Sequence, residues 1–162
     1  MPIRATVISD ASVYEEGRPP NQKVFGGWAA HVRIDGNPKP IRGYGSIHNT
    51  TAKLTSTTCE MFAAINGIWL AKEKGATEVL VRSDCMAVIS AITKGDLSFK
   101  MLEIWHVALT HAKCLDVSLR AHHVRAHTEA ADATSWINDW CDRHARRGMS
   151  FSRKGIKCLE LR

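Results

Sequence analysis

The order in which strand-like and helix-like segments follow one another most strongly limits what this chain can fold into. Alternating, β-branched segments come first, and the rest of the chain changes between helical and strand periodicities. Strands are expected at residues 5–13, 24–34, 41–47, 78–83 and 117–124, and helices at 57–74, 85–94, 99–113 and 132–147. The order β-β-β-α-β-α-α-β-α predicts an α/β fold with a five-stranded mixed sheet that begins as an antiparallel meander.

Three carboxylates stand at the edges of apolar segments that are far apart in the chain. Asp10 is expected at the end of the first strand, Asp84 follows the fourth, and Glu60 falls in the first turn of the first helix. Ligands usually bind outside the carboxyl ends of strands in open α/β sheets. Mg²⁺ prefers oxygen ligands, and paired sites hold two ions ~3.5–4 Å apart through shared carboxylates. These residues predict a divalent-metal site, although a helix cap or a solvated charge is the commoner role of a single acid.

The positive charge is concentrated near the end of the chain. The chain has 162 residues, a size typical of one domain, and its net charge is +6. Residues 143–162 contain seven bases and one acid, which accounts for that charge. We therefore expect a domain at residues 1–148 and a basic C-terminal tail at 149–162. The tail either contacts a polyanion or is merely solvated.

Cysteine usage and hydropathy indicate the compartment. The five cysteines are an odd number without a C-x-x-C pair, which favours reduced thiols over a disulfide framework. The sequence has no apolar run near eighteen residues and no signal-peptide pattern at its N-terminus. A cytoplasmic protein that does not associate with membranes is the expectation.

Five short fragments carry a resemblance to a known family. They correspond to its Asp-Gly-Ser at the end of the first strand, its paired glycines before an aromatic residue, its Met-Glu-Leu-x-Ala-Ala helix, its Thr-Asp-Ser, and its Asn-Glu-x-x-Asp-x-x-Ala. In this chain they are Asp10-Ala11-Ser12, Gly26-Gly27-Trp28, Cys59-Glu60-Met61-Phe62-Ala63-Ala64, Ser83-Asp84-Cys85 and the run from Asn138 to Ala145. Over residues 5–147 the chain resembles a type 1 ribonuclease H. The resemblance implies a ribonuclease H-like fold with helices on both faces of the sheet.

The resemblance also implies an activity and a fourth carboxylate. Family members cleave the RNA strand of RNA–DNA hybrids with two Mg²⁺ ions, which Mn²⁺ is expected to replace. Asp142 falls on the metal-site aspartate of the family, and Asp139 falls on an accompanying acid; because residues three apart share a helix face, spacing alone does not separate them. Ala145 favours Asp142, since a small residue lets that face approach the sheet. The expected metal ligands and catalytic acids are therefore Asp10, Glu60, Asp84 and Asp142.

Further positions match family residues around the metals. His127 stands where the family has a loop histidine for proton handling and product release, and the neighbouring His122 and His123 are expected on a strand, one facing in and one out. Thr55 matches a threonine that contacts a phosphate of the DNA strand. The remaining expected substrate contacts are departures or partial matches: Ala11 in place of glycine, Ser12, and Ser56 and Thr57 in place of an asparagine pair. The basic protrusion of some members is missing.

Two other functions are compatible with the same sequence. One is another nuclease of this superfold, such as a proofreading exonuclease or a junction resolvase. An exonuclease of that kind usually has Asp-x-Glu in its first strand, whereas Ser12 stands at the third position here. The other is a non-catalytic module that binds hybrids or duplexes, for which a lost acid is the expected mark. The expected protein is a monomer with no obligate protein partner.

Overall fold

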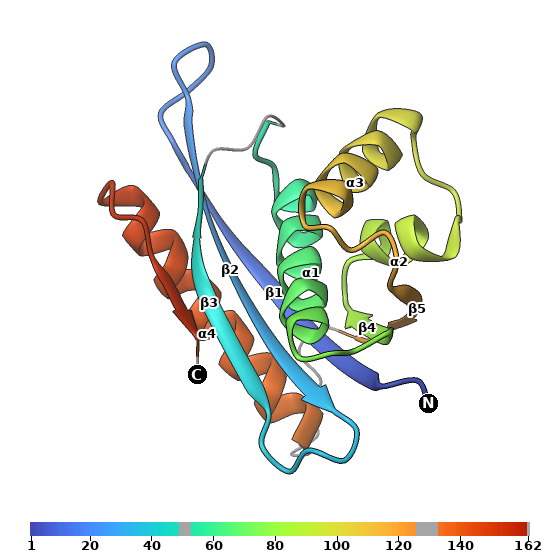
Figure 1. Cartoon of the computed structure of the whole chain (residues 1–162). Coiled ribbons are helices and arrows are strands. Elements are labelled where there is room, and N and C mark those ends of the chain that lie inside the picture. Colours follow the sequence, from blue (N-terminus) through green and yellow to red (C-terminus); the bar gives the residue numbers. More distant parts are fainter. Residues whose placement is uncertain (49–52, 126–132, 162) are drawn as a thin grey trace.

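The computed structural model describes residues 1–48, 53–125 and 133–161 (Figure 1). Its strands are β1 Arg4–Glu16, β2 Lys23–Ile34, β3 Ile41–Ile47, β4 Glu78–Ser83, β5 Ser118–His123 and β6 Leu159–Leu161. Its helices are α1 Ser56–Glu73, α2 Met86–Thr93, α3 Phe99–His111 and α4 Ala133–Arg153. In the part of the chain that is described, no helix combines the length and apolar character needed to cross a bilayer.

The strands form one mixed sheet in the order β5-β4-β1-β2-β3-β6. Strands β1, β2 and β3 are the predicted antiparallel meander, while β4 and β5 add in parallel beside β1. The sheet has six strands, so the predicted number of five was wrong. Strand β6 is only three residues long, too short for an alternating pattern, and it is held beside β3 by hydrogen bonds between Ser46 and Cys158.

Helices cover both faces of the sheet, as the resemblance implied (Figure 1). Helix α1 packs against β1 and β2, and α2 and α3 lie on the same side. Ten of the eighteen residues of α1 are buried, including Met61, Ile65 and Ile68, so this helix forms the centre of the larger core. Helix α4 packs on the other face across β1, β2 and β3, over a smaller core around Tyr44 and Trp140.

Helix α4 is longer than the predicted helix, which ended at residue 147. It continues through Gly148 to Arg153, so the boundary expected after residue 148 falls inside a helix. A glycine often ends a helix, but Gly148 has a packing role: a Cβ atom there would collide with the backbone of Gly45. Gly27 has the same role, because a Cβ atom on it would collide with the backbone of Ala145. These glycines let α4 lie directly on β2 and β3.

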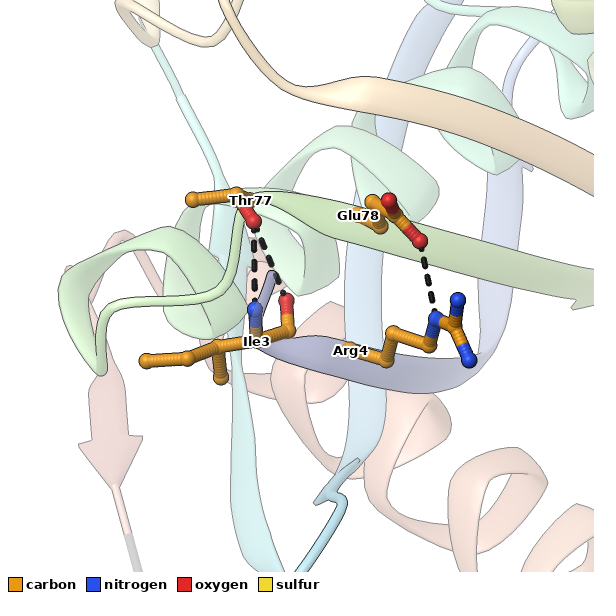
Figure 2. A network of polar contacts seen from close by, with 4 residues as sticks. All are labelled: Ile3, Arg4, Thr77 and Glu78. Atoms are coloured by element: carbon orange, nitrogen blue, oxygen red, sulfur yellow. Dashed lines mark hydrogen bonds and ion pairs between the residues drawn. The ribbon is translucent and has the colours of Figure 1, made fainter. Parts of the chain in front are cut away.

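The register between the parallel strands β1 and β4 places two of the acids, Asp10 and Asp84, at the same height along the strands. At its start, the Ile3 amide donates to the Thr77 hydroxyl at 3.2 Å, and Arg4 Nε lies 2.9 Å from a Glu78 oxygen (Figure 2). The register then continues to Ile8 opposite Arg82. Two residues further along each strand stand Asp10 and Asp84, which therefore lie at the same level, where the pairing of β1 with β4 has ended. Asp84 directly follows β4, but Asp10 lies inside β1, which continues beside β2 to Glu16, so the prediction that Asp10 ends the first strand was wrong.

Candidate metal centre

Three of the predicted metal ligands meet at this level of the sheet. Asp10 comes from β1, Asp84 follows β4 directly, and Glu60 comes from α1. One carboxylate oxygen from each residue lies within 4.8 Å of the others. Such a group of oxygen donors can hold a hard divalent cation. The three acids are far apart in the sequence and come together in the structure, and their role as metal ligands stays a prediction.

The start of α1 positions Glu60. Thr55 caps the helix: its hydroxyl accepts from the Thr58 amide at 3.1 Å, and the Thr58 hydroxyl accepts from the Thr55 amide at 2.8 Å. This reciprocal capping box satisfies two amides at the helix end. The helix begins at Ser56, so Glu60 lies at the start of its second turn. The prediction that it lies in the first turn was wrong.

Burial gives the centre its electrostatic character. Removal from water raises the pKa of Glu60, and the nearby charge of Asp10 raises it further. Desolvation likewise raises the pKa of Asp10, and the charges of Asp84 and Asp142 add to that rise. One oxygen of Glu60 accepts from the Ala11 amide at 3.3 Å, while the other is buried and has no hydrogen-bond partner among the described residues. An unsatisfied carboxylate oxygen facing other acids fits a bound cation, which would compensate for its lost hydration.

The fourth expected acid lies beside this group. Asp142 of α4 lines a cavity of about 260 Å³ together with Asp10 and Asp84. Its side chain is 27% exposed, and Arg146 lies 3.2 Å from one of its oxygens. Asp139 lines the same cavity but is exposed, and only Asp142 contributes to the raised pKa of Asp10. The structure thus brings both candidates to the cavity and places Asp142 in closer electrostatic contact with the centre.

The predictions for the histidines have mixed outcomes. His127 lies outside the described residues. His122 and His123 are both on β5 and both exposed, so the prediction that one faces inward was wrong. Strand β5 is at the edge of the sheet, and both of its last residues reach solvent there. His123 Nε2 lies 3.3 Å from the backbone oxygen of Asp84.

The expected substrate-contacting residues surround the acids on two elements. Ala11 and Ser12 follow Asp10 on β1 and are half-buried, and the Ala11 amide also donates to Asp10 at 2.9 Å. Thr55 is exposed at the cap of α1, followed by the exposed Ser56 and the half-buried Thr57. The cap hydroxyl of Thr55 already accepts one hydrogen bond, so a phosphate oxygen there would use it as a donor.

Two cations in the cavity were missed by sequence reasoning. Arg82 and Arg125 line it together with the acids, and Arg82 lies 3.4 Å from the Thr134 hydroxyl of α4. A signal for Arg82 was available: it stands two residues before Asp84, and alternate residues of a strand share one face. Arg125 follows β5 without any comparable pattern.

A larger hollow of the described surface lies elsewhere. It is a groove of about 1110 Å³ between α1 and α3, lined mainly by apolar side chains such as Phe62, Trp69 and Ile104. Thr55 is at its margin, but Glu103 is the only acid in the lining. Among the described residues its lining includes no cluster of metal ligands, so the chemistry is expected at the smaller, acidic cavity.

Comparisons with known proteins agree with this geometry. Residues 42–136, more than half of the chain, match the profile of the reverse transcriptase-like family. No curated protein matches the chain. Similar solved structures include the N-terminal RNase H domain of a Mycobacterium tuberculosis protein, which is 18% identical with a TM-score of 0.63 over 93% of this chain and 98% of that domain.

Two further structures extend the comparison. RNase H1 from the archaeon Halobacterium salinarum is 19% identical, with a TM-score of 0.60 over 91% of this chain and 98% of that one. LC11-RNase H1, isolated from compost by a metagenomic approach and solved with an RNA/DNA hybrid, is 16% identical, with a TM-score of 0.63 over 90% and 96% of the two chains. At these identities the similarity shows a shared fold.

Proposed function

Because this chain belongs to the reverse transcriptase-like family and has the ribonuclease H fold, we propose that it is a metal-dependent ribonuclease H. Its substrate in this proposal is an RNA–DNA hybrid, of which it cuts the RNA strand internally. The observation that carries the proposal is the meeting of Asp10, Glu60 and Asp84 within 4.8 Å at the carboxyl end of β4. A member that only binds nucleic acid has no need to keep three acids so close at the cost of their mutual repulsion.

The acids divide between two positions. Asp10 is the shared ligand in this proposal, since the charges of both Asp84 and Asp142 act on it. Glu60 and Asp84 would hold one ion beside it, and Asp142 would hold the other. When bound, two Mg²⁺ or Mn²⁺ ions would lower the pKa of the attacking water and stabilise the charge on the leaving 3′ oxygen. Arg146 lies 3.2 Å from an Asp142 oxygen and would have to release it when an ion binds.

Recognition of RNA rests on the residues around Glu60. The ribose 2′-OH distinguishes RNA from DNA and can donate a hydrogen bond. The buried Glu60 oxygen without a partner is an acceptor for that hydroxyl or a metal ligand. Thr55, Ser56 and Thr57 present hydroxyls at the start of α1, where a phosphate of the DNA strand would accept from them.

The proposal includes the acid–base group and the cellular setting. His127 is assigned proton transfer or product release on the strength of the family resemblance. A monomer in the reducing cytoplasm is proposed, and the five free cysteines, three of them buried, support a reducing compartment.

A cleavage assay tests the activity. Labelled RNA–DNA hybrid, duplex DNA, duplex RNA and single strands are each incubated with Mg²⁺, Mn²⁺ or EDTA. We expect internal cuts in the RNA strand of the hybrid alone, with either metal and not with EDTA. Asp84→Asn should abolish them without unfolding the protein, while the matched control Asp96→Asn, at an exposed loop position, should cleave normally. Cleavage of single strands from an end, or at branched DNA in a follow-up assay, would identify another nuclease of this fold; binding without cleavage would identify a non-catalytic module.

A further inference from the structure

The face of β4 and β5 that lies on the α4 side carries Arg82, Arg120 and His122. Ile8 packs against α4, and its neighbour in the sheet is Arg82, whose own neighbour on β5 is His122. Paired residues on adjacent strands share a face, so Arg82 and His122 lie on the α4 side. The next row on this face contains Leu80 and Arg120. Helix α4 packs over β1, β2 and β3, and both Arg120 and His122 are exposed.

This group differs from the cation at the far end of the same face. There, Arg4 is neutralised by Glu78 at 2.9 Å (Figure 2). In the rows nearer the metal centre no acid stands on β4 or β5, and neither Arg120 nor His122 has an ion pair among the described residues. An exposed arginine with no acid beside it attracts polyanions, and no ion pair has to be broken when it binds one.

The cations run directly into the metal centre. Arg82 and Arg125 line the cavity that contains Asp10 and Asp84. Arg120 is level with Leu80, four residues before Asp84 on the neighbouring strand. At ~3.3 Å per residue this separates Arg120 from the acids by about 13 Å along the strand. With one phosphate per ~3.4 Å of each strand of a duplex, that distance corresponds to about four nucleotides.

We propose that the face of β4 and β5 with the exposed Arg120 and the half-buried Arg82, together with the exposed Arg125 that follows β5, binds the phosphate backbone of the nucleic acid where it continues beyond the cut site. This inference rests on the proposed function, because it assumes that the strand starts at the metal centre. The cations sit on a rigid sheet and contact phosphates, so they extend the binding site without reading sequence. They add to binding affinity only when the substrate extends beyond the metal centre.

The test compares substrates of different length. One substrate is a short hybrid core. The others carry an extension of about eight nucleotides on one side of the cut or on the other, made of single-stranded DNA, single-stranded RNA or further hybrid. This length exceeds the distance to Arg120 estimated from phosphate spacing. Equilibrium binding is measured in EDTA over a range of salt, and turnover is measured separately with Mg²⁺. Arg120→Gln should weaken binding of one set of extended substrates several-fold and lower their salt slope by ~0.7 for single strands or ~0.9 for duplex. Binding of the core and turnover at saturation should not change.

Matched variants separate charge from structure. Arg120→Lys retains the charge and should bind like the parent. Lys74→Gln removes an exposed charge at the end of α1 and should have no effect on length dependence. If Arg120→Gln binds every extended substrate as tightly as the parent does, and cleaves the hybrid normally, this inference alone is overturned. Absence of hybrid cleavage by the parent protein would overturn the proposed function, whatever the binding shows.

Discussion

Helices α1 and α4 bring acids to the same centre from opposite faces of the sheet, under different constraints. In α1 ten of eighteen residues are buried, and Glu60 lies within an apolar environment that raises its pKa. In α4 only five of twenty-one residues are buried, and Asp142 is partly solvated and paired with Arg146. The packing of the core therefore sets the position of Glu60. Asp142 lies on a partly solvated face of α4, where Asp139, one turn earlier, is a second candidate ligand.

The largest effect is expected for the acid of α1. Glu60→Gln keeps the shape of the side chain but removes its charge, so hybrid cleavage should fall by about 10³-fold or more, as expected when several kcal/mol of metal-dependent stabilisation are lost. The protein should remain folded because the amide fits the same space. Cleavage rates and circular dichroism measured on the same preparation check both points; a fully active, folded variant contradicts the assignment of Glu60.

The next effect is expected at His127, which precedes α4 in the sequence. Its replacement by alanine should reduce turnover by ~10²–10⁴-fold, the usual range for a positioned acid–base group. Metal and hybrid binding should be nearly unchanged, since His127 is not proposed as a ligand. Single-turnover and steady-state rates separate chemistry from product release. His122→Ala and His123→Ala should have much smaller effects on rate, and the reverse order would show that the loop histidine was misplaced.

Within α4 the two neighbouring acids should differ in their effects. Asp142→Asn should lower cleavage by roughly 10²-fold through loss of a metal ligand, whereas Asp139→Asn, at an exposed position, should lower it by less than about tenfold. Rates measured over a range of Mg²⁺ concentrations reveal whether extra metal rescues either variant. If Asp139→Asn is the more damaging change, then Asp139 is the α4 ligand.

The buried carboxyls should also make stability depend on pH. The pKa values of Glu60 and Asp10 are raised in the folded protein, so without metal it retains protons that the unfolded chain releases above its ordinary carboxyl pKa near ~4. The folded state then binds more protons, and this contribution to the free energy of unfolding is complete below about pH 4 and is lost as the pH rises through the raised values. Thermal unfolding in EDTA from about pH 5 to about pH 9 should show this loss. Glu60→Gln should reduce the slope, and Mg²⁺ should raise Tm more at high than at low pH; an unchanged slope contradicts the burial argument.

The smallest effect is expected at the basic end of α4. Deleting everything after Gly148 would remove the last turn of α4 and strand β6, so point variants are the cleaner test. Arg153 lies 3.7 Å from the centre of the Tyr14 ring, but Lys154 and Lys157 are exposed. If they contact phosphate, Lys154→Gln with Lys157→Gln should lower the salt slope of hybrid binding by up to ~1.8, at ~0.9 per contact. Turnover at saturating substrate should stay the same. An unchanged slope would mean that these lysines are only solvated.

The sequence alone predicted most of the helices and strands and singled out the acids as candidate ligands. The β-branched segments around Val7 and Val81 have a strand periodicity that depends only on neighbouring residues, and an acid directly after each segment reaches the same level once the strands pair in parallel. The apolar pattern of α1 likewise placed Glu60 on a helix. The periodicity of Asn138 to Ala145 also predicted that Asp139 and Asp142 share a helix face, but it left the choice between them to spacing and resemblance.

Only the tertiary structure decided where distant segments approach one another. Gly148 continues α4 because its missing Cβ admits the backbone of Gly45, a contact between residues about a hundred positions apart that local periodicity does not encode. Strand β6 forms because the edge of β3 is open to pairing and Ser46 binds the backbone of Cys158 just before it. Three residues are too few for the strand to show an alternating sequence pattern. The His144 ring of α4 has its centre 5.0 Å from that of the Tyr44 ring on β3, and Arg42 of β3 lies 5.7 Å from the Trp140 ring; these contacts help fix α4 to the sheet. Local sequence encodes hydrogen-bonding period and side-chain alternation, whereas burial, pairing and the pKa of Glu60 depend on which surfaces close on one another in the folded chain.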